Sequence, residues 1–148
     1  ERSKRAMSIA AILASKGSEV MTITADSPLR DAVELLGTHR IGALPVMDGD
    51  SVGGIISERD IVYCLKEYGA EVLNMPVSKA MSSPALTVTR DTDVLSALGL
   101  ITLRRVRHLP VVEDGALIGL VSIGDLVKFR IERIEQEANA LRDYIQSA

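Results

Sequence analysis

The hydrophobic and polar positions along this 148-residue chain follow two alternating patterns. Short apolar runs that are followed by charged residues and glycine predict pairs of antiparallel strands. Longer stretches, in which apolar residues recur every three or four positions, predict amphipathic helices. A strand pair is expected within 109–121, with Glu113, Asp114 and Gly115 as its turn, and a long helix is expected to begin at Ser122. The pattern therefore predicts a mixed α/β (α+β) fold.

The same pattern occurs twice. Residues 40–62 align without a gap with residues 105–127, and the register continues upstream through Thr22 and Thr87. A gapless internal repeat of this length predicts two copies of one structural unit, each about half the size of a typical domain. We expect the two copies to pack against each other as a pseudo-twofold pair.

Each copy is predicted to contain a strand, a helix, two strands and a second helix. The first strands are expected at 20–24 and 86–89. The predicted divisions of the chain are an N-terminal helix and linker at 1–18, a first repeat at 19–69, a connector at 70–84, a second repeat at 85–130 and a C-terminal helical extension at 131–148. The apolar stripe of the last helix extends beyond what one repeat can cover, which predicts a homodimer in which this helix takes part.

Two helix starts are predicted from capping residues. In the first repeat, Asp26 or Ser27 is expected to cap a helix that has Pro28 at its first position. In the second repeat, Asp91 or Thr92 is expected to do the same.

Composition and charge limit the classes of protein. The chain is 47% hydrophobic and 25% charged, which is typical of a compact globular domain. Its net charge of -3 argues against nucleic acid as a partner. No run approaches about 20 apolar residues, so no membrane span is expected, and the polar start predicts no signal peptide. The single cysteine, Cys64, is expected in the core and favours a reducing compartment, which predicts a cytoplasmic protein.

A serine and an aspartate three residues apart open a helix in each copy. They are Ser57 with Asp60, and Ser122 with Asp125. The simpler interpretation is a helix cap, with the acid favoured by the helix dipole. However, residues so spaced face the same side of a helix. A hydroxyl and a carboxylate placed together can also hold a ribose, because the sugar hydroxyls donate to the acid. Both interpretations follow from these residues.

Basic residues cluster before the second strand pair. They are Arg104, Arg105, Arg107 and His108. Such residues stabilise the end of a helix, and they are also the groups that bind phosphate. The first copy has Gly42 in place of Arg107, but it carries Arg59 in its second helix start. In a pseudo-twofold pair, the arginine of one copy can serve the ligand of the other.

Signatures of catalysis are missing from the sequence. It contains no phosphate-binding glycine loop of the kinds found in nucleotide-dependent enzymes. His39 and His108 lack the spacing of metal ligands, and no nucleophile is paired with a base. We therefore expect a protein that is not an enzyme and has no catalytic cofactor.

The repeated strand–helix–strand–strand–helix pattern, with LPVV and GLVSIGDL in its second copy, resembles the cystathionine-β-synthase (CBS) domain. Two copies in tandem resemble a Bateman module. The resemblance covers residues 7–130 and extends to small stand-alone CBS-pair proteins, some of which are labelled as related to inosine-monophosphate dehydrogenase. The barrel of such a dehydrogenase needs about 250 residues, so the label would mislead about activity.

The resemblance implies a regulatory module that binds AMP, ADP, ATP or NAD(H) in the cleft between the repeats. The implied ribose contacts are Ser57, Asp60, Ser122 and Asp125. The implied adenine contacts are Thr22, Ala43, Leu44, Pro45, Thr87, His108, Leu109 and Pro110. Gly54 and Gly119 would let the ligand approach the backbone closely.

For the phosphate, the resemblance implies a contact from Arg107. His108, if protonated, and Arg59, from the other copy, are the further candidates. The alternative function is a protein-interaction scaffold with a vestigial ligand site. In both cases the expected partners are a second copy of the chain and a target protein that the sequence does not identify.

Overall fold

The computed structural model describes residues 7–147, which form two compact units. The helical unit comprises the described residues of Glu1–Gly17, Arg90–His108 and Val121–Ala148. The sheet unit comprises Ser18–Thr89 and Leu109–Leu120. The predicted first repeat therefore lies within the sheet unit, whereas the second repeat contributes to both units. The pseudo-twofold packing of the repeats stays a prediction.

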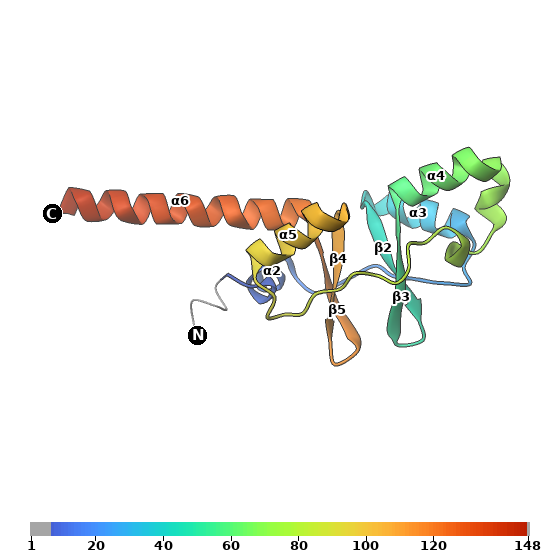
Figure 1. Cartoon of the computed structure of the whole chain (residues 1–148), viewed down its shortest axis with the longest axis horizontal. Coiled ribbons are helices and arrows are strands. Elements are labelled where there is room, and N and C mark those ends of the chain that lie inside the picture. The colour runs from blue at the N-terminus through green and yellow to red at the C-terminus, as the bar shows by residue number, and fades with distance from the viewer. Residues whose placement is uncertain (1–6, 148) are drawn as a thin grey trace. The chain divides into compact units, whose positions relative to one another are not determined.

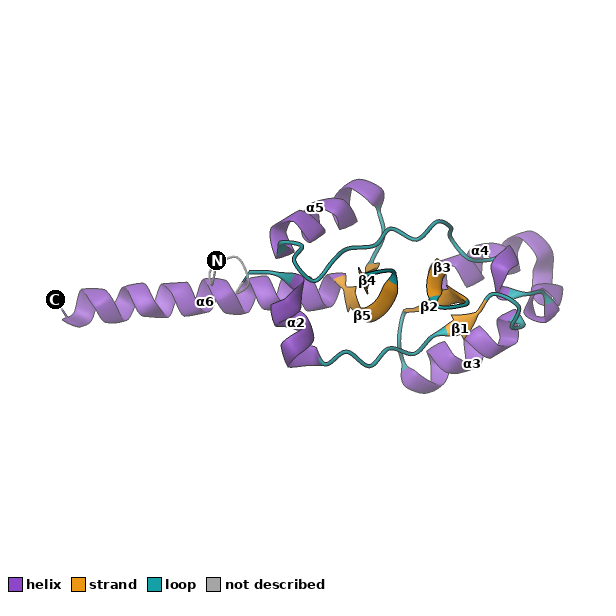
Figure 2. Cartoon of the chain, turned by 90° about the horizontal axis from the view of Figure 1, so that it is seen from below, coloured by secondary structure: helices purple, strands orange, loops and turns teal. Residues whose placement is uncertain are grey.

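A three-stranded sheet forms the centre of the sheet unit. β1 (Ile23–Thr24) pairs in parallel with β2 (Ala43–Asp48), which pairs in antiparallel fashion with β3 (Ser51–Ser57). Helix α3 (Leu29–His39) contacts β2, and α4 (Glu58–Tyr68) contacts β3 (Figure 2). This is the predicted order of elements, although β1 is shorter than the five residues expected.

The core of the sheet unit lies between this sheet and its helices. In β2, four consecutive residues from Ala43 to Val46 are buried, as expected for a strand that has a neighbour on each edge and cover on its faces. Cys64 is half-buried against this core, as predicted. Burial, with smaller contributions from the negative charges of Asp60 and Glu67, raises the pKa of its thiol. The buried cluster consists of Ile23, Leu29, Ala32, Leu36, Leu44, Val46, Ile56, Ile61, Val72, Val77 and Ala80.

The connector is held against the sheet. It contains two short 3-10 helices, η1 (Gly69–Asn74) and η2 (Val77–Lys79). Beyond them, Ser82 and Ile55 exchange two backbone hydrogen bonds, of 2.9 and 3.0 Å. A Cβ atom on Gly54 would lie 2.7 Å from the Ser82 carbonyl oxygen. The close approach predicted for a ligand at Gly54 is therefore occupied by the connector.

The helical unit is built from three segments that are distant in sequence. α6 (Ile123–Ser147) contacts both α5 (Val94–Arg104) and α2 (Ile9–Lys16). The amide of Ile9 donates to the carbonyl of Thr92 at 2.9 Å, which joins α2 to the segment before α5. The N-terminal helix predicted within 1–18 is confirmed, and Gly17 is its C-cap. α6 continues well past the other two helices (Figure 1).

The second strand pair is β4 (His108–Glu113) with β5 (Ala116–Ser122). Asp114 and Gly115 both have positive φ, at 51° and 81°, which is the geometry of a tight hairpin turn and confirms the predicted turn.

The strand predicted at 86–89 is wrong. It is reduced to one parallel bridge between Val88 and Val111. Two residues later, the carbonyl of Arg90 already accepts from the amide of Ala10, so the chain leaves the sheet edge before a strand can form.

Both predicted helix starts are corrected. Pro28 is the N-cap of α3 and not its first residue, and no side chain caps this helix. The carbonyl of Met75 accepts instead from the first helical amide, that of Leu29, at 2.8 Å. In α5 the cap is Asp93, whose carboxylate accepts from Leu95 and Ser96, because only the residue directly before the first turn reaches those amides.

Candidate functional site

In the first repeat, Ser57 and Asp60 form a capping box at the start of α4. The Ser57 hydroxyl accepts from the Asp60 amide at 3.3 Å, and the Ser57 amide donates to Oδ2 of Asp60 at 2.9 Å. Oδ2 also accepts from the Ser57 hydroxyl, while Oδ1 accepts from the Ser82 hydroxyl at 3.0 Å. The cap interpretation is therefore confirmed, and both carboxylate oxygens already accept hydrogen bonds from within the sheet unit.

In the second repeat, Ser122 and Asp125 form the same pair at the start of α6. The Ser122 hydroxyl accepts from the Asp125 amide at 3.1 Å, and the Ser122 amide donates to Oδ2 of Asp125 at 2.9 Å. The third partner differs, because the Lys16 ammonium lies 2.6 Å from Oδ2 of Asp125. Lys16 is the last residue of α2, so the ion pair lies within the helical unit.

The electrostatics of Asp125 follow from these contacts. Burial alone would raise the pKa of its carboxyl group. The hydrogen bond from Lys16, the bonds from Ser122 and the positive charge of Lys16 together outweigh burial, and the pKa lies below its ordinary value of 3.8. Asp125 is therefore an anion at neutral pH.

Each helix start is tied to the residue before the facing strand. The Ile123 amide donates to the Arg107 carbonyl at 2.8 Å, and in the first repeat the Glu58 amide donates to the Gly42 carbonyl at 3.1 Å. The exposed side chain of Arg107 therefore starts next to the Ser122–Asp125 pair. No arginine occupies this place in the first repeat.

The structure thus brings together four groups that were predicted separately or missed. The second-repeat set, which we call the α6-start site, consists of Lys16, Arg107, Ser122 and Asp125. Lys16 and Ser82 were missed by the sequence analysis, because each lies in the segment that precedes the other repeat. A signal that could have found them is their position: Lys16 precedes the first repeat by nearly the same number of residues as Ser82 precedes the second.

The predicted adenine contacts divide into two groups. Ala43, Leu44 and Leu109 are buried core residues, so their side chains pack inside the protein. Ala43 lies opposite Ser57 in the β2–β3 register. Pro45 and Pro110 are also buried, whereas His108 is half-buried and Thr22 and Thr87 are exposed.

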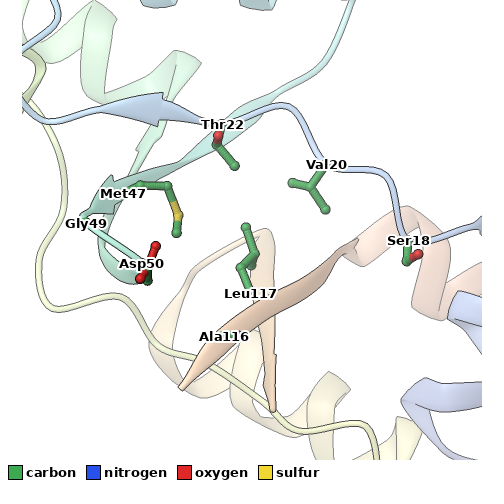
Figure 3. A pocket seen from close by; sticks show the side chains of 8 residues that line it. All are labelled: Ser18, Val20, Thr22, Met47, Gly49, Asp50, Ala116 and Leu117. Atoms are coloured by element: carbon green, nitrogen blue, oxygen red, sulfur yellow. The ribbon is translucent and has the colours of Figure 1, made fainter. Parts of the chain in front are cut away.

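Thr22 lines an open pocket of about 560 Å³ in the sheet unit. The side chains of Val20, Met47 and Leu117 point into the same space (Figure 3). Asp50, at the turn end of β3, also lines it. Because a strand rises about 3.3 Å per residue, Ser57 at the other end of β3 lies roughly 20 Å away along the strand. The pocket is therefore separate from the Ser57–Asp60 pair.

Two other observations bear on the chemistry. Within residues 7–147, no group of three or more His, Cys, Asp and Glu side chains is arranged to hold a metal ion. None of the helices in this described part combines the length and the apolar character needed to cross a membrane.

Arg59 lies exposed in α4, and its predicted role toward a ligand of the other repeat stays a prediction.

Comparison with known proteins identifies the family. The CBS domain family model matches residues 13–67 and again residues 77–132. The chain belongs to the CBS-domain family. The tandem pair predicted from the sequence is confirmed by this match.

Relatives agree with this assignment. The CBS domain-containing protein CBSX3, mitochondrial, of Arabidopsis thaliana is 35% identical over 147 residues, covering 93% of this chain and 71% of the relative. Among solved structures, the CBS-domain protein ATU1752 from Agrobacterium tumefaciens is 37% identical with a TM-score of 0.80, covering 84% of this chain and 94% of that chain. CBSX2, solved in complex with AMP, is 27% identical with a TM-score of 0.67, covering 76% and 88% of the two chains.

Proposed function

We propose that this CBS pair is a regulatory module that binds an adenosine nucleotide and does not turn it over. The candidate ligands are AMP, ADP, ATP and NAD(H). The observation that carries the proposal is the α6-start site, in which an ionised carboxylate, a hydroxyl and the Lys16 ammonium meet at one helix start and the backbone carbonyl of Arg107 accepts from the first helical amide. The AMP complex of CBSX2 supports the same class of ligand.

Each group has a role in the proposed binding. A carboxylate has about four lone-pair sites, so Asp125 can accept from ribose hydroxyls while it keeps its bond from the Ser122 amide. A phosphate carried by that ribose is repelled by the Asp125 anion. It is attracted by the guanidinium of Arg107 and the ammonium of Lys16, which are the charged donors that bind phosphate best. The proposal therefore separates ribose recognition from phosphate recognition.

The first repeat is proposed to bind more weakly. Asp60 has both oxygens engaged by Ser57 and Ser82, and Gly42 stands where the second repeat has Arg107. A ligand there would have to displace internal hydrogen bonds without gaining the phosphate contact. Arg59 and His108 are the remaining candidates for a compensating phosphate contact.

Thermal unfolding with added ligands tests the ligand class. A ligand that binds only the folded state stabilises it by about 2.7 kcal/mol at a hundredfold excess over its Kd. AMP or ATP should raise Tm, and GMP should raise it less. Stabilisation by GMP that equals that by AMP, or no stabilisation by any adenosine ligand, would contradict the proposal and favour the interaction scaffold. Nucleotide recovered intact after long incubation separates a sensor from an enzyme.

We also propose a homodimer, because α6 exposes apolar side chains along most of its length. Light scattering at micromolar concentration should give twice the mass of the chain. The cytoplasmic location expected from the single cysteine stays a prediction, since CBSX3 is named as mitochondrial. A target protein that responds to the bound nucleotide is expected and is not identified by these residues.

A further inference from the structure

The exposed apolar residues of α6 follow a coiled-coil repeat. Alternating steps of four and three residues join them, which is the spacing of the d and a positions of a heptad. The large members of this row are 41–65% exposed, and Ala138 is exposed as well. We call this row the α6 seam, and it consists of Val127 (d), Ile131 (a), Ile134 (d), Ala138 (a), Leu141 (d) and Ile145 (a).

The contacts of α6 with its own unit lie elsewhere on the helix. Leu126 is fully buried, and Phe129, Arg130 and Arg133 are partly buried. Leu126, Phe129 and Arg133 occupy c and f positions of the same heptad. Arg130 occupies the g position beside the seam, so none of these residues belongs to the seam itself. The helical unit therefore leaves the α6 seam uncovered. An apolar row of this length on an exposed helix needs a packing partner to stabilise it.

The charges beside the seam are matched for a second copy in parallel orientation. In a parallel pair, each g residue faces the e residue of the next heptad in its partner, and e and g charges set partner choice and orientation. Arg130 at g would face Glu135 of the second copy, and Glu137 at g would face Arg142. The twofold axis repeats each pair, so all four contacts are attractive.

The antiparallel arrangement is disfavoured by the same charges. When two copies overlap along the whole seam in opposite directions, e residues face e residues and g residues face g residues. Lys128 would then face Arg142, Glu135 would face its own counterpart, and so would Glu137. Like charges would meet at each of these points, and a shift that relieves them would shorten the seam.

We propose that the α6 seams of two copies pair as a parallel, in-register, two-stranded coiled coil over residues 127–145. This inference rests on the proposed homodimer and specifies which surface forms it and in which orientation. β-branched Ile131 and Ile145 at a positions, with Leu141 at d, are typical of two-stranded parallel pairs, whereas β-branched Ile134 at d is more typical of three or four strands. The pairing requires no nucleotide, so it can be tested apart from ligand binding.

Cysteine crosslinking tests the orientation. Paired helix axes lie about 8–10 Å apart, with Cα atoms about 2.3 Å from each axis. Directly facing Cα atoms are therefore about 3.4–5.4 Å apart, a range that overlaps the Cα separation of a disulfide. In a Cys64→Ala background, Leu141→Cys should give a disulfide-linked dimer under mild oxidation. The matched control, Gln136→Cys at an f position, should stay uncrosslinked.

Charge reversal tests the register. Glu137→Arg places like charges at both g–e contacts with Arg142, and should weaken dimerisation at least about fivefold. The double variant Glu137→Arg with Arg142→Glu should restore it. Glu132→Arg makes the same change of charge at a b position, outside the seam, and should leave the dimer unchanged. Sedimentation equilibrium measures all of these, and circular dichroism checks that each variant is folded.

Different failures point to different conclusions. A monomeric wild-type protein overturns both the homodimer and this pairing. If Glu137→Arg leaves the dimer equally stable and Leu141→Cys does not crosslink, only the pairing is overturned. The dimer contact then lies on another surface. Crosslinking of Val127→Cys chains to Ile145→Cys chains would show the antiparallel form. A trimer would overturn the two-stranded form.

Discussion

The two Ser–Asp pairs have the same spacing and the same capping bonds, yet their surroundings differ. Asp60 accepts a hydrogen bond from the neutral hydroxyl of Ser82, whereas Asp125 forms an ion pair with the charged ammonium of Lys16. The carbonyl that meets the helix start belongs to Gly42 in one repeat and to Arg107 in the other. The repeated sequence therefore determines the cap, and residues outside the shared pattern determine what charge a ligand would meet there.

The largest expected effect comes from removing one carboxylate at a time. Asp125→Ala should weaken adenosine and AMP alike by about a hundredfold, because both ligands carry the ribose hydroxyls and each hydrogen bond to a charged group contributes about 1.5–3 kcal/mol. Asp60→Ala should weaken binding at the tighter site, which is proposed to be that of the second repeat, much less. Isothermal titration calorimetry of both ligands into both variants measures this. Equal losses in the two variants would remove the proposed difference between the repeats.

Arg107→Ala sharpens the comparison by separating phosphate from ribose. AMP and ATP should bind about ten- to a hundredfold more weakly, while adenosine stays nearly unchanged because it carries no charge. The same titrations in the wild-type protein should show AMP affinity falling with added salt. If AMP affinity is unchanged by the substitution, Arg107 does not contact the phosphate and its proposed role is refuted.

Gly54→Ala tests whether the connector is fixed beside the first repeat. The new Cβ would lie 2.7 Å from the Ser82 carbonyl oxygen and 2.8 Å from Sδ of Met81. Overpacking against backbone should lower the free energy of unfolding by at least about 1 kcal/mol, measured by urea denaturation. Gly37→Ala, in the last turn of α3, has no atom within 4 Å of its Cβ and should raise stability. An unchanged stability in Gly54→Ala would mean that the connector moves away readily.

The smallest effect is expected from Lys16→Met. Lys16 is 40% exposed, so its ion pair with Asp125 should contribute at most about 1 kcal/mol. Since the folded pKa of Asp125 is lowered, this contribution is present above its ordinary pKa of 3.8 and is lost as the pH falls through the folded value. The difference in stability between wild type and variant should therefore be constant near neutral pH and vanish in acid. A difference that grows on acidification would contradict the assignment.

The sequence predicted well those features that depend on neighbouring residues. The two hairpins, the Ser57–Asp60 and Ser122–Asp125 caps and the long α6 follow from local turn, capping and helical patterns. The strand at 86–89 failed because its length depends on where Arg90 bonds, and that bond is to a residue far away in the chain. Lys16 could not be found for the same reason, since only the packing of α2 against α6 brings it to Asp125.

The division of the second repeat between two units has a consequence for the order of folding. Most of the sheet unit is one continuous segment, Ser18–Thr89, so its contacts can form between residues that are near in sequence. The helical unit needs α2 to contact α6 and to bond to the segment before α5, and both follow it much later in the chain. Because long loops must close before such distant contacts stabilise anything, the sheet unit should fold first. During synthesis, the side of α2 that contacts α6 would therefore stay exposed until residues beyond Val121 emerge from the ribosome.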